Sequence, residues 1–259
     1  MSEKHALSLL DKYGDRPWSR RFVFWSGGRD STVVLHLALR VWKEDFKAVF
    51  IDTGITLPET LEYVKEMSEL WGLDLVTLEP GVDFWKRVRI AGFPTVKFLW
   101  CREVLKMEPI KRFFGLKENR GWKLQVLGIR KAESCVRRKS PYYQKPFVRH
   151  SVLKFTYQLS PILEWSDTQV KEYMRRHGIP ENPCCKIYGT TGCYFCPFVR
   201  NKKHYLTLKE RHPELFQKIV DAENNMRSKP GWAFPEYSIK TLIPQTSLEE
   251  MRFKEVLGE

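Results

Sequence analysis

The feature that most constrains the fold is the hexapeptide Ser-Gly-Gly-Arg-Asp-Ser at residues 26–31. An apolar stretch, residues 21–25, precedes it, and a run of helical character, residues 32–39, follows it. Two glycines between a strand and a helix let backbone N–H groups approach an anion, and the helix N-terminus adds partial positive charge there. The pattern predicts a phosphate-binding loop, and with it an α/β chain that handles a nucleotide. The alternative is a tight strand-to-helix turn capped by a serine.

The side chains of this loop suit phosphate chemistry. Two serines can donate to phosphate oxygens, an arginine can pair with them, and an aspartate can hold Mg²⁺ or orient the loop. The spacing matches neither the G-x-x-x-x-G-K-[ST] loop nor the G-x-G-x-x-G fingerprint. We expect the nucleotide to contact the whole loop: Ser26, Gly27, Gly28, Arg29, Asp30 and Ser31.

Strand-like and helix-like segments alternate along the first half of the chain. Short apolar segments predict strands at residues 21–25, 47–51, 74–78 and 123–127. Amphipathic patterns predict helices at residues 3–12, 31–43, 58–71, 82–90 and 102–113. Alternation of this kind predicts a parallel sheet with right-handed crossovers, and a nucleotide above the carboxyl ends of its strands.

Polar residues follow two of the predicted strands and should reach the same crevice. Asp52 and Thr53 end the second strand and can contact an adenosine or a metal, or form an Asx-type turn. Gly128 permits close approach of a ligand after the fourth strand, and Arg130 can grip a phosphate or form a structural salt bridge. We predict that Asp30 and Arg130 are the catalytic pair.

The character of the chain changes after about residue 160. A helix is expected at residues 167–177, then a Pro- and Cys-rich segment at 180–197, then helices near 203–209 and 212–227. The tail from residue 230 has little periodicity and is expected to be irregular. The predicted division is a nucleotide-binding α/β domain, residues 1–165, and a helical, Cys-rich metal-binding region, residues 166–259.

The cysteines point to a metal rather than to disulfides. The chain has six cysteines, and we expect it to carry no export signal; disulfides are rare in proteins without one. Cys193 and Cys196 form a C-x-x-C pair, Cys184 and Cys185 precede it closely, and all four could instead be reduced core thiols. Two further thiols, Cys101 and Cys135, stand alone.

The charge balance favours a polyanionic partner. Lys and Arg number 44 against 31 acidic residues, a net charge of +13. Part of the excess lies at residues 131–149, where basic residues that include Arg137 alternate with aromatic ones. Such a segment suits phosphate backbones and stacked bases, and the alternative is a solvated basic loop. No apolar run is long enough for a membrane span, so we expect a cytoplasmic protein without a membrane partner.

Several motifs occur in a recognisable order. They are the hexapeptide, Phe-Ile-Asp-Thr-Gly at 50–54, Trp-Cys-Arg at 100–102, Gly-Ile-Arg at 128–130, Ser-Pro-Ile at 160–162, Ile-Pro-Glu-Asn-Pro at 179–183 and Gly-Cys-Tyr-Phe-Cys-Pro at 192–197. Together they resemble the phosphoadenosine phosphosulfate (PAPS) reductase family, a branch of the PP-loop ATP pyrophosphatase superfamily. The resemblance implies a Rossmann-like adenine nucleotide α-hydrolase fold with a five-stranded parallel sheet. It also implies that ATP or an adenylyl sulfate binds on the hexapeptide.

The resemblance extends to the cysteines. Adenylylsulfate reductases of this family hold a [4Fe–4S] cluster with a Cys-Cys pair and a distant C-x-x-C. By that likeness Cys101, Cys193 and Cys196 are ligands, and Cys185, in preference to Cys184, is the fourth. Zinc also suits four thiolates, and the cluster is the preferred prediction. Cys135 is either a persulfide carrier or an ordinary loop thiol.

One departure from the family directs the functional prediction. Sulfonucleotide reductases attack sulfate with a cysteine in a C-terminal Glu-Cys-Gly-Leu-His-like tail, whereas no cysteine follows Cys196 here. We therefore predict ATP-dependent, adenylating sulfur transfer to a nucleic acid, tRNA or DNA, with sulfur from a donor protein. The alternatives are a sulfonucleotide reductase that uses a partner thiol from a reductant protein, and a non-catalytic nucleotide- or nucleic-acid-binding subunit. The oligomeric state, a homodimer included, stays open.

Overall fold

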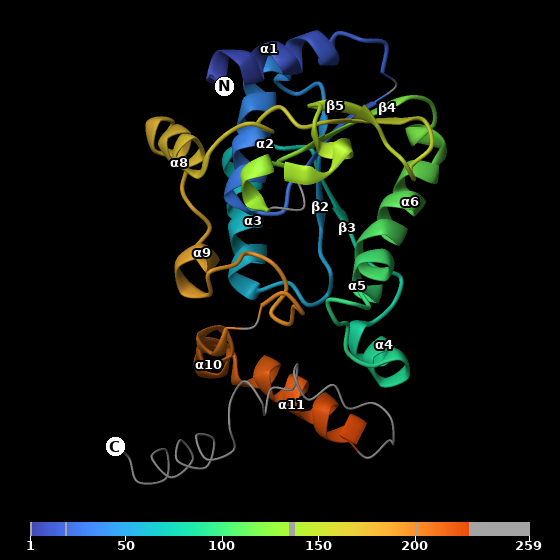
Figure 1. The fold of residues 1–259 in the computed structure, drawn as a ribbon, viewed down its shortest axis with the longest axis vertical. Coiled ribbons are helices and arrows are strands. Elements are labelled where there is room, and N and C mark those ends of the chain that lie inside the picture. The colour runs from blue at the N-terminus through green and yellow to red at the C-terminus, as the bar shows by residue number, and fades with distance from the viewer. Residues whose placement is uncertain (1, 19, 135–137, 200, 228–259) are drawn as a thin grey trace.

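The computed structural model describes residues 2–18, 20–134, 138–199 and 201–227 of the 259-residue chain. Its centre is a six-stranded sheet in the order β3-β2-β1-β4-β6-β5 (Figure 1). Neighbouring strands are parallel except β5, which is antiparallel to β6. The strands are β1 (Arg20–Phe24), β2 (Lys47–Ile51), β3 (Leu75–Leu78), β4 (Lys123–Leu127), β5 (Phe147–Arg149) and β6 (Thr156–Leu159).

The predicted α/β class is confirmed, and five of the strands form the expected parallel sheet, but a sixth strand, β5, is antiparallel. The four strands expected from apolar segments are β1 to β4, each within one residue of its predicted bounds. β5 and β6 were not expected as segments of their own, because they span three and four residues and carry polar side chains. A sequence pattern of period two needs a longer run than that to be distinguished from a loop.

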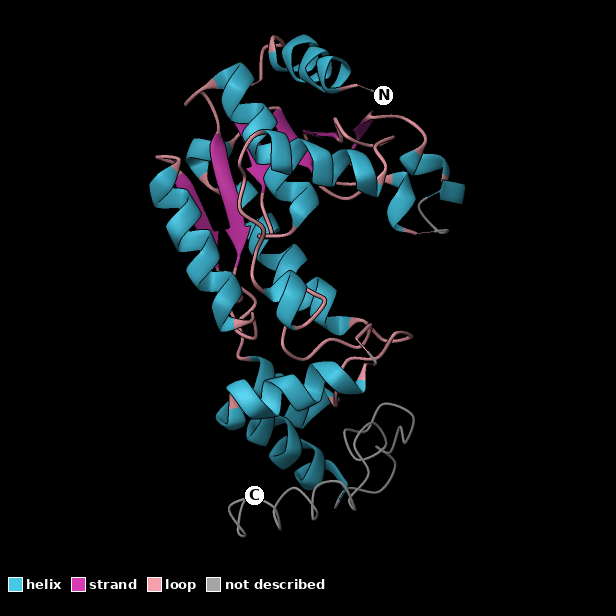
Figure 2. Ribbon diagram, turned by 90° about the vertical axis from the view of Figure 1, so that its left-hand side faces the viewer, coloured by secondary structure: helices cyan, strands magenta, loops and turns pink. Residues whose placement is uncertain are grey.

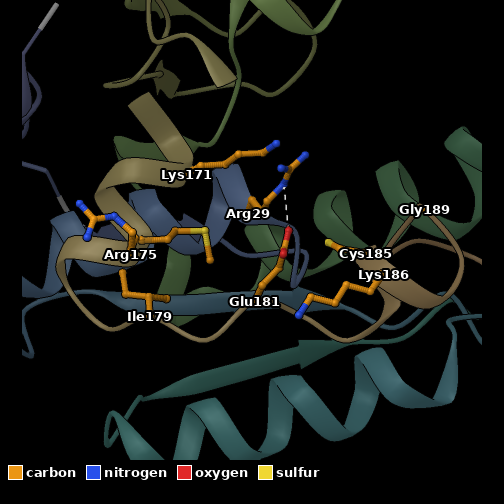
Figure 3. Close-up of a pocket in the computed structure, with 9 residues that line it drawn as sticks. Arg29, Lys171, Arg175, Ile179, Glu181, Cys185, Lys186 and Gly189 are labelled. Carbon is orange, nitrogen blue, oxygen red and sulfur yellow. Dashed lines mark ion pairs between the residues drawn. The ribbon is translucent and has the colours of Figure 1, made fainter. Parts of the chain in front are cut away.

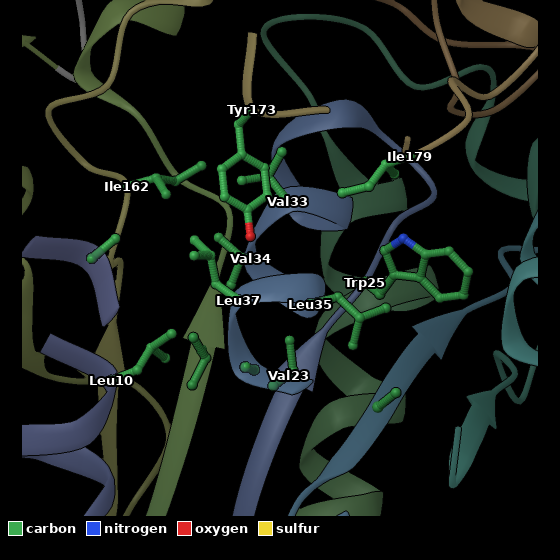
Figure 4. Close-up of a cluster of buried hydrophobic side chains, with 14 of the residues drawn as sticks. Leu10, Val23, Trp25, Val33, Val34, Leu35, Leu37, Ile162, Tyr173 and Ile179 are labelled. Atoms are coloured by element: carbon green, nitrogen blue, oxygen red, sulfur yellow. The ribbon is translucent and has the colours of Figure 1, made fainter. Parts of the chain in front are cut away.

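One face of the sheet is covered by α1 (Glu3–Gly14), α2 (Arg29–Trp42), α3 (Pro58–Leu70) and α8 (Asp167–Arg176), as Figure 1 shows. Figure 4 shows the core between them, in which Val23 and Trp25 belong to the same buried cluster as Val33, Leu35 and Leu37 of α2. Tyr173 of α8 belongs to the same fully buried cluster. Residues on both sides of the predicted boundary at 165/166 therefore share one core, and the division into two domains stays a prediction.

The opposite face is covered by α6 (Glu108–Gly115). Phe113 and Phe114 of this helix pack on Phe22 of β1, with ring centroids 5.2 Å apart in both pairs. The single helix expected at 102–113 is divided into α5 (Trp100–Arg102), a π-helical turn (Glu103–Met107) and α6. Pro109 explains the division, since a residue without an N–H cannot continue the regular ladder of hydrogen bonds.

The remaining helices lie beyond the carboxyl ends of the strands, as Figures 1 and 2 show. They are α4 (Phe84–Ala91), α9 (Cys184–Ile187), α10 (Lys202–Arg211) and α11 (Pro213–Arg227). Their apolar side chains form a second buried cluster together with Ile55 and Leu57, which follow β2. Short 3-10 turns lie at Lys117–Asn119, Lys131–Glu133 and Pro141–Tyr143. Within the described residues, every helix is too short or too polar to span a bilayer.

Candidate functional site

The hexapeptide forms the connection between β1 and the first turn of α2. Gly28 is the N-cap residue of the helix, and Gly27 adopts a φ of +72°, which favours glycine. A Cβ at Gly27 would also lie 3.1 Å from Asn182 Nδ2 and 3.1 Å from a methyl carbon of Thr60. Asn182 donates a hydrogen bond to the Gly27 carbonyl at 3.2 Å. The loop is thus held in one conformation from outside as well as by its own sequence.

The hydroxyl of Ser31 closes the loop from inside. It accepts a hydrogen bond from the Ser26 N–H at 3.1 Å and donates to the Gly28 carbonyl at 2.9 Å. Ser26 Oγ lies 3.1 Å from Ser31 Oγ, so the two hydroxyls face each other across the turn. A loop ordered before its ligand arrives binds that ligand without the entropic cost of ordering.

Gly128 lets β4 end directly against the start of α2. A Cβ at this position would lie 2.5 Å from the Ser31 backbone nitrogen and 2.6 Å from the Asp30 carbonyl carbon. We expected Gly128 to permit the close approach of a ligand. In the structure, the group that approaches Gly128 closely is the backbone of α2. Gly128 also lines the large cavity described below.

Arg130 is buried and joins two carboxylates. Its Nε lies 2.9 Å from Asp30 Oδ1, and its Nη2 donates to Asp167 Oδ1 at 2.6 Å. Burial raises the pKa of Asp30, and the Arg130 guanidinium opposes that shift. The structure thus contains the structural salt bridge that the sequence allowed for Arg130. The catalytic roles of this pair, in phosphate and magnesium binding, stay predictions.

A cavity of about 1010 Å³ opens at the carboxyl ends of β1, β2 and β4. Pockets of this size hold nucleotide-sized ligands. Ser26 and Ser31 line it from the loop, Thr53 lines it from the end of β2, and Cys193 lines it from the Cys-rich segment. The position agrees with the expected place above the strand ends.

Asp52 and Thr53 are directed to different places. Asp52 Oδ1 accepts hydrogen bonds at 2.9 Å from the Gly54 N–H and the Thr56 hydroxyl, which is the Asx-type turn considered as its alternative. Asp52 lines a smaller pocket with Glu79 and Asp83 instead of the large cavity. Thr53 lies in the cavity wall, with its Oγ1 3.2 Å from Cys193 Sγ. Nucleotide contact by Asp52 therefore has no support from the geometry and stays a prediction.

Sequence reasoning missed several polar side chains of the cavity. Arg102 of α5 and Lys106 of the π-helical turn line it from the side of the sheet that α6 covers. Gln125 lies in the middle of β4, and its Oε1 is buried and forms no hydrogen bond within the described residues. A glutamine between Leu124 and Val126 of a buried strand was the signal that could have revealed it. Other polar lining residues that sequence reasoning missed include Glu133, Ser140, His150 and Gln158.

Part of the basic, aromatic segment 131–149 borders this cavity. Tyr142 and Tyr143 line it, and the Tyr142 hydroxyl donates to Gln158 Oε1 at 3.1 Å. Lys131 at the start of the segment pairs with Glu164. Cys135 and Arg137 lie outside the described residues, so their predicted roles stay predictions.

The predicted metal ligands fall into two groups. Burial raises the pKa of Cys101 to about 11, and the charges of the nearby Cys193 and Cys196 thiols act in the same direction. These three thiols therefore belong to one neighbourhood. Cys185 lies in a different pocket beside Arg29 and Glu181, whereas Cys184 is buried and accepts a hydrogen bond from Thr60 at 3.3 Å.

The structure does not bring the four predicted thiols together around one centre. Among the residues that the structure describes, no group of three or more His, Cys, Asp or Glu side chains is arranged to hold a metal ion. A cluster or a zinc ion needs its thiolates around one centre. The [4Fe–4S] cluster and its zinc alternative stay predictions from the sequence.

Arg29 is directed away from the large cavity. Its Nε lies 3.4 Å from Glu181 Oε1, and its side chain lines a separate pocket with residues of α8 and α9. The expected contact of Arg29 with the phosphates of a nucleotide in the cavity therefore stays untested.

Comparison with known sequences finds one family and several relatives. Residues 20–199 match the phosphoadenosine phosphosulfate reductase domain. An uncharacterized protein of Methanocaldococcus jannaschii is 34% identical over 224 residues, which is 85% of this chain and 52% of that protein. A phosphoadenosine 5'-phosphosulfate reductase of Xanthomonas euvesicatoria pv. vesicatoria is 30% identical over 162 residues, 61% of this chain and 63% of that enzyme. The chain thus spans about half the length of the first relative.

Comparison with solved structures supports the fold. The crystal structure of phosphoadenylyl-sulfate reductase from Candida auris, a phosphate complex, superposes with a TM-score of 0.52 and 19% identity. The match covers 74% of this chain and 96% of that one. At this identity the similarity shows a shared fold alone.

Proposed function

Because the chain belongs to the phosphoadenosine phosphosulfate reductase family, we propose that it is an enzyme that binds ATP with Mg²⁺ in the large cavity and adenylates a nucleic acid for sulfur transfer. The observation that carries the proposal is the ordered loop at residues 26–31, whose Ser26 and Ser31 line a cavity of nucleotide size. The N-terminus of α2 directly behind the loop favours negative charge at this point.

The charges around the cavity support a nucleotide with its phosphates at the loop. Arg102 and Lys106 line the same cavity and are the cations that can neutralise a polyphosphate there. Thr53 and Gln125 offer polar atoms that can orient the rest of the ligand. Asp30 belongs to the loop, where it would take part in holding the magnesium ion or keep the loop in place through Arg130.

The acceptor is proposed from the basic character of the chain. Tyr142 and Tyr143 of the segment 131–149 line the cavity and can stack on bases, and the net charge of +13 attracts a polyanion. An acceptor oxygen attacks the α-phosphate, a new P–O bond forms, and the bond to the β-phosphate breaks with release of pyrophosphate. A sulfur nucleophile from a donor protein then displaces AMP.

A second candidate is favoured by the relatives that are named phosphoadenosine 5'-phosphosulfate reductase. In this alternative the same cavity binds an adenylyl sulfate, and a thiol of a partner protein attacks its sulfur. The loop and the cations Arg102 and Lys106 suit ATP and an adenylyl sulfate equally well. The two candidate functions therefore differ in which nucleotide binds and in which acceptor reacts.

Calorimetry on the full chain tests the proposal, with ATP and Mg²⁺ in one titration and adenylyl sulfate in the other. We expect ATP to bind, and Ser31→Ala to weaken binding about fivefold, because one hydrogen bond that closes the loop is worth about 1 kcal/mol. Ser68→Ala on the exposed side of α3 is the matched control and should leave binding unchanged.

A pyrophosphate-release assay with tRNA or DNA completes the test. Release that depends on the nucleic acid supports adenylation of that acceptor. If adenylyl sulfate binds and ATP does not, the reductase alternative replaces the transferase. If neither nucleotide binds, the proposal that the cavity is a nucleotide site is wrong.

A further inference from the structure

A second pocket, of about 380 Å³, lies beside the phosphate loop and shares no lining residue with the nucleotide cavity (Figure 3). Its lining is strongly basic, since four cationic side chains face a single carboxylate, Glu181. The buried side chains of Met174 and Ile179 also line it. The cations are Arg29, Lys171, Arg175 and Lys186.

The sequence places these cations together through the periodicity of α8. Asp167, Lys171 and Arg175 recur every four residues, so they lie along one face of the helix. Asp167 is tied by Arg130 to Asp30, which directly follows Arg29 at the start of α2. The Arg130 bridge therefore aligns the basic face of α8 with the phosphate loop.

The charges of this pocket are poorly compensated within the protein. Lys171, Arg175 and Lys186 are exposed and form no ion pair with any residue that the structure describes. Lys171 and Arg175 are like charges one turn apart, an arrangement that by itself destabilises a helix. Arg29 has one carboxylate within reach, Glu181, at 3.4 Å. An anionic ligand is the partner that this arrangement lacks.

We propose that this pocket binds backbone phosphates of a single-stranded polynucleotide, and the inference rests on the proposed transfer to a nucleic acid. Lys171 and Arg175 are separated by about 6 Å along α8, so they form an open row instead of an enclosed cage. An open row suits successive phosphates of a chain better than one small anion. Arg29 adds a guanidinium, which can hold a phosphate through two hydrogen bonds.

The location gives the pocket its function. Arg29 belongs to the same loop as Ser26 and Ser31, which line the nucleotide cavity. A strand held on the basic face of α8 therefore passes beside the phosphates of the bound nucleotide. Such positioning of two reactants is what an adenylation step requires.

The test measures binding of a fluorescent oligothymidylate to the full chain by anisotropy over a range of salt concentrations. The variant Lys171→Ala/Arg175→Ala is compared with Arg89→Ala/Lys218→Ala, which removes the same charge from exposed positions of α4 and α11. We expect the pocket variant to bind several-fold more weakly at low salt. Its salt slope should fall by about 1.4, because each phosphate contact on a single strand contributes about 0.7. The control should keep the wild-type slope.

ATP titrations of the same proteins separate this inference from the proposed function. If the pocket variant keeps the wild-type slope while ATP still binds, the inference fails and the nucleotide site stands. If wild-type protein binds no oligonucleotide at low salt, the inference also fails. If the pocket variant loses binding of ATP or inorganic phosphate but keeps binding of the oligonucleotide, the pocket holds a small phosphate and the inference is overturned.

Discussion

Gly128 shows how one residue couples the sheet to the phosphate loop. In Gly128→Ala the new methyl group meets backbone atoms of Asp30 and Ser31 at 2.5–2.7 Å, and backbone cannot turn aside as a side chain can. We expect a loss of about 1–3 kcal/mol in the free energy of unfolding, as for other overpacked sites, together with weaker ATP binding. Urea unfolding and calorimetry measure the two effects. Gly115→Ala, at a position with no neighbour within 4 Å, is the control, and equal stability of the two variants would contradict the prediction.

Arg130 provides the second prediction at the residue scale. Arg130→Met leaves the carboxylate of Asp30 without the cation that offsets its burial, and breaking a buried pair in this way costs about 3 kcal/mol. Burial already raises the pKa of Asp30, and loss of Arg130 raises it further. The loss of stability in Arg130→Met should therefore be smallest at low pH, where Asp30 is protonated in the folded and the unfolded protein. It should grow as pH rises through the folded-state pKa of Asp30 in the variant.

Urea unfolding between acidic and neutral pH measures this dependence. Arg176→Met is the matched control, because Arg176 lies on α8, as does Asp167, the partner of Arg130, but pairs with Glu3 and Glu172 at an exposed position. Its cost should be below about 1 kcal/mol. A deficit in Arg130→Met that does not change with pH would show that Asp30 is not the group left unpaired.

At the element scale, Glu59 joins the start of α3 to the α10–α11 region. Its Oε1 accepts hydrogen bonds from the Tyr188 hydroxyl at 3.1 Å and Arg211 Nε at 3.0 Å, and lies 3.1 Å from His212 Nε2. Although burial raises it, the pKa of Glu59 is lowered overall by these hydrogen bonds and one from its own backbone. A lowered carboxyl pKa means stability that is present above the unfolded-state value and lost as pH falls through the folded-state value.

The third prediction follows from that sign. Glu59→Gln should reduce the free energy of unfolding by about 1–3 kcal/mol at pH 7, since the buried Tyr188 hydroxyl and the more exposed Arg211 and His212 lose a charged acceptor. The difference from wild type should shrink as pH falls below the unfolded-state pKa of a glutamate, about 4.3, and through the lower folded-state pKa of Glu59. Glu62→Gln, exposed on the same helix, is the control. A difference between Glu59→Gln and wild type that persists unchanged at acidic pH would refute the account.

At the scale of the whole molecule, the sequence predicts what is local and misses what is distant. The strands β1 to β4 and nearly every helix have apolar periodicity that can be read directly, and the loop at 26–31 carries its own signal. The sequence carries no such signal for which partner a charged side chain contacts. Arg130 meets Asp167 across a long stretch of sequence, and Arg29 turns away from the cavity toward Glu181. Those choices depend on packing of α8 against α2, which no window of sequence contains.

The cysteines provide the last prediction, because sequence and structure differ on the fourth thiol. The sequence groups Cys185 with Cys101, Cys193 and Cys196, whereas the structure places Cys185 beside Arg29 and Glu181. We therefore expect Cys185→Ser to keep the iron or zinc content of wild-type protein purified without oxygen. Cys193→Ser should lose that metal, since its thiol belongs to one neighbourhood with those of Cys101 and Cys196. Elemental analysis with an absorption spectrum distinguishes a brown iron–sulfur protein from a colourless zinc protein. Loss of metal in Cys185→Ser would support the four-thiolate site that the sequence predicts. Wild-type protein that contains neither iron nor zinc would show that the predicted metal site is wrong.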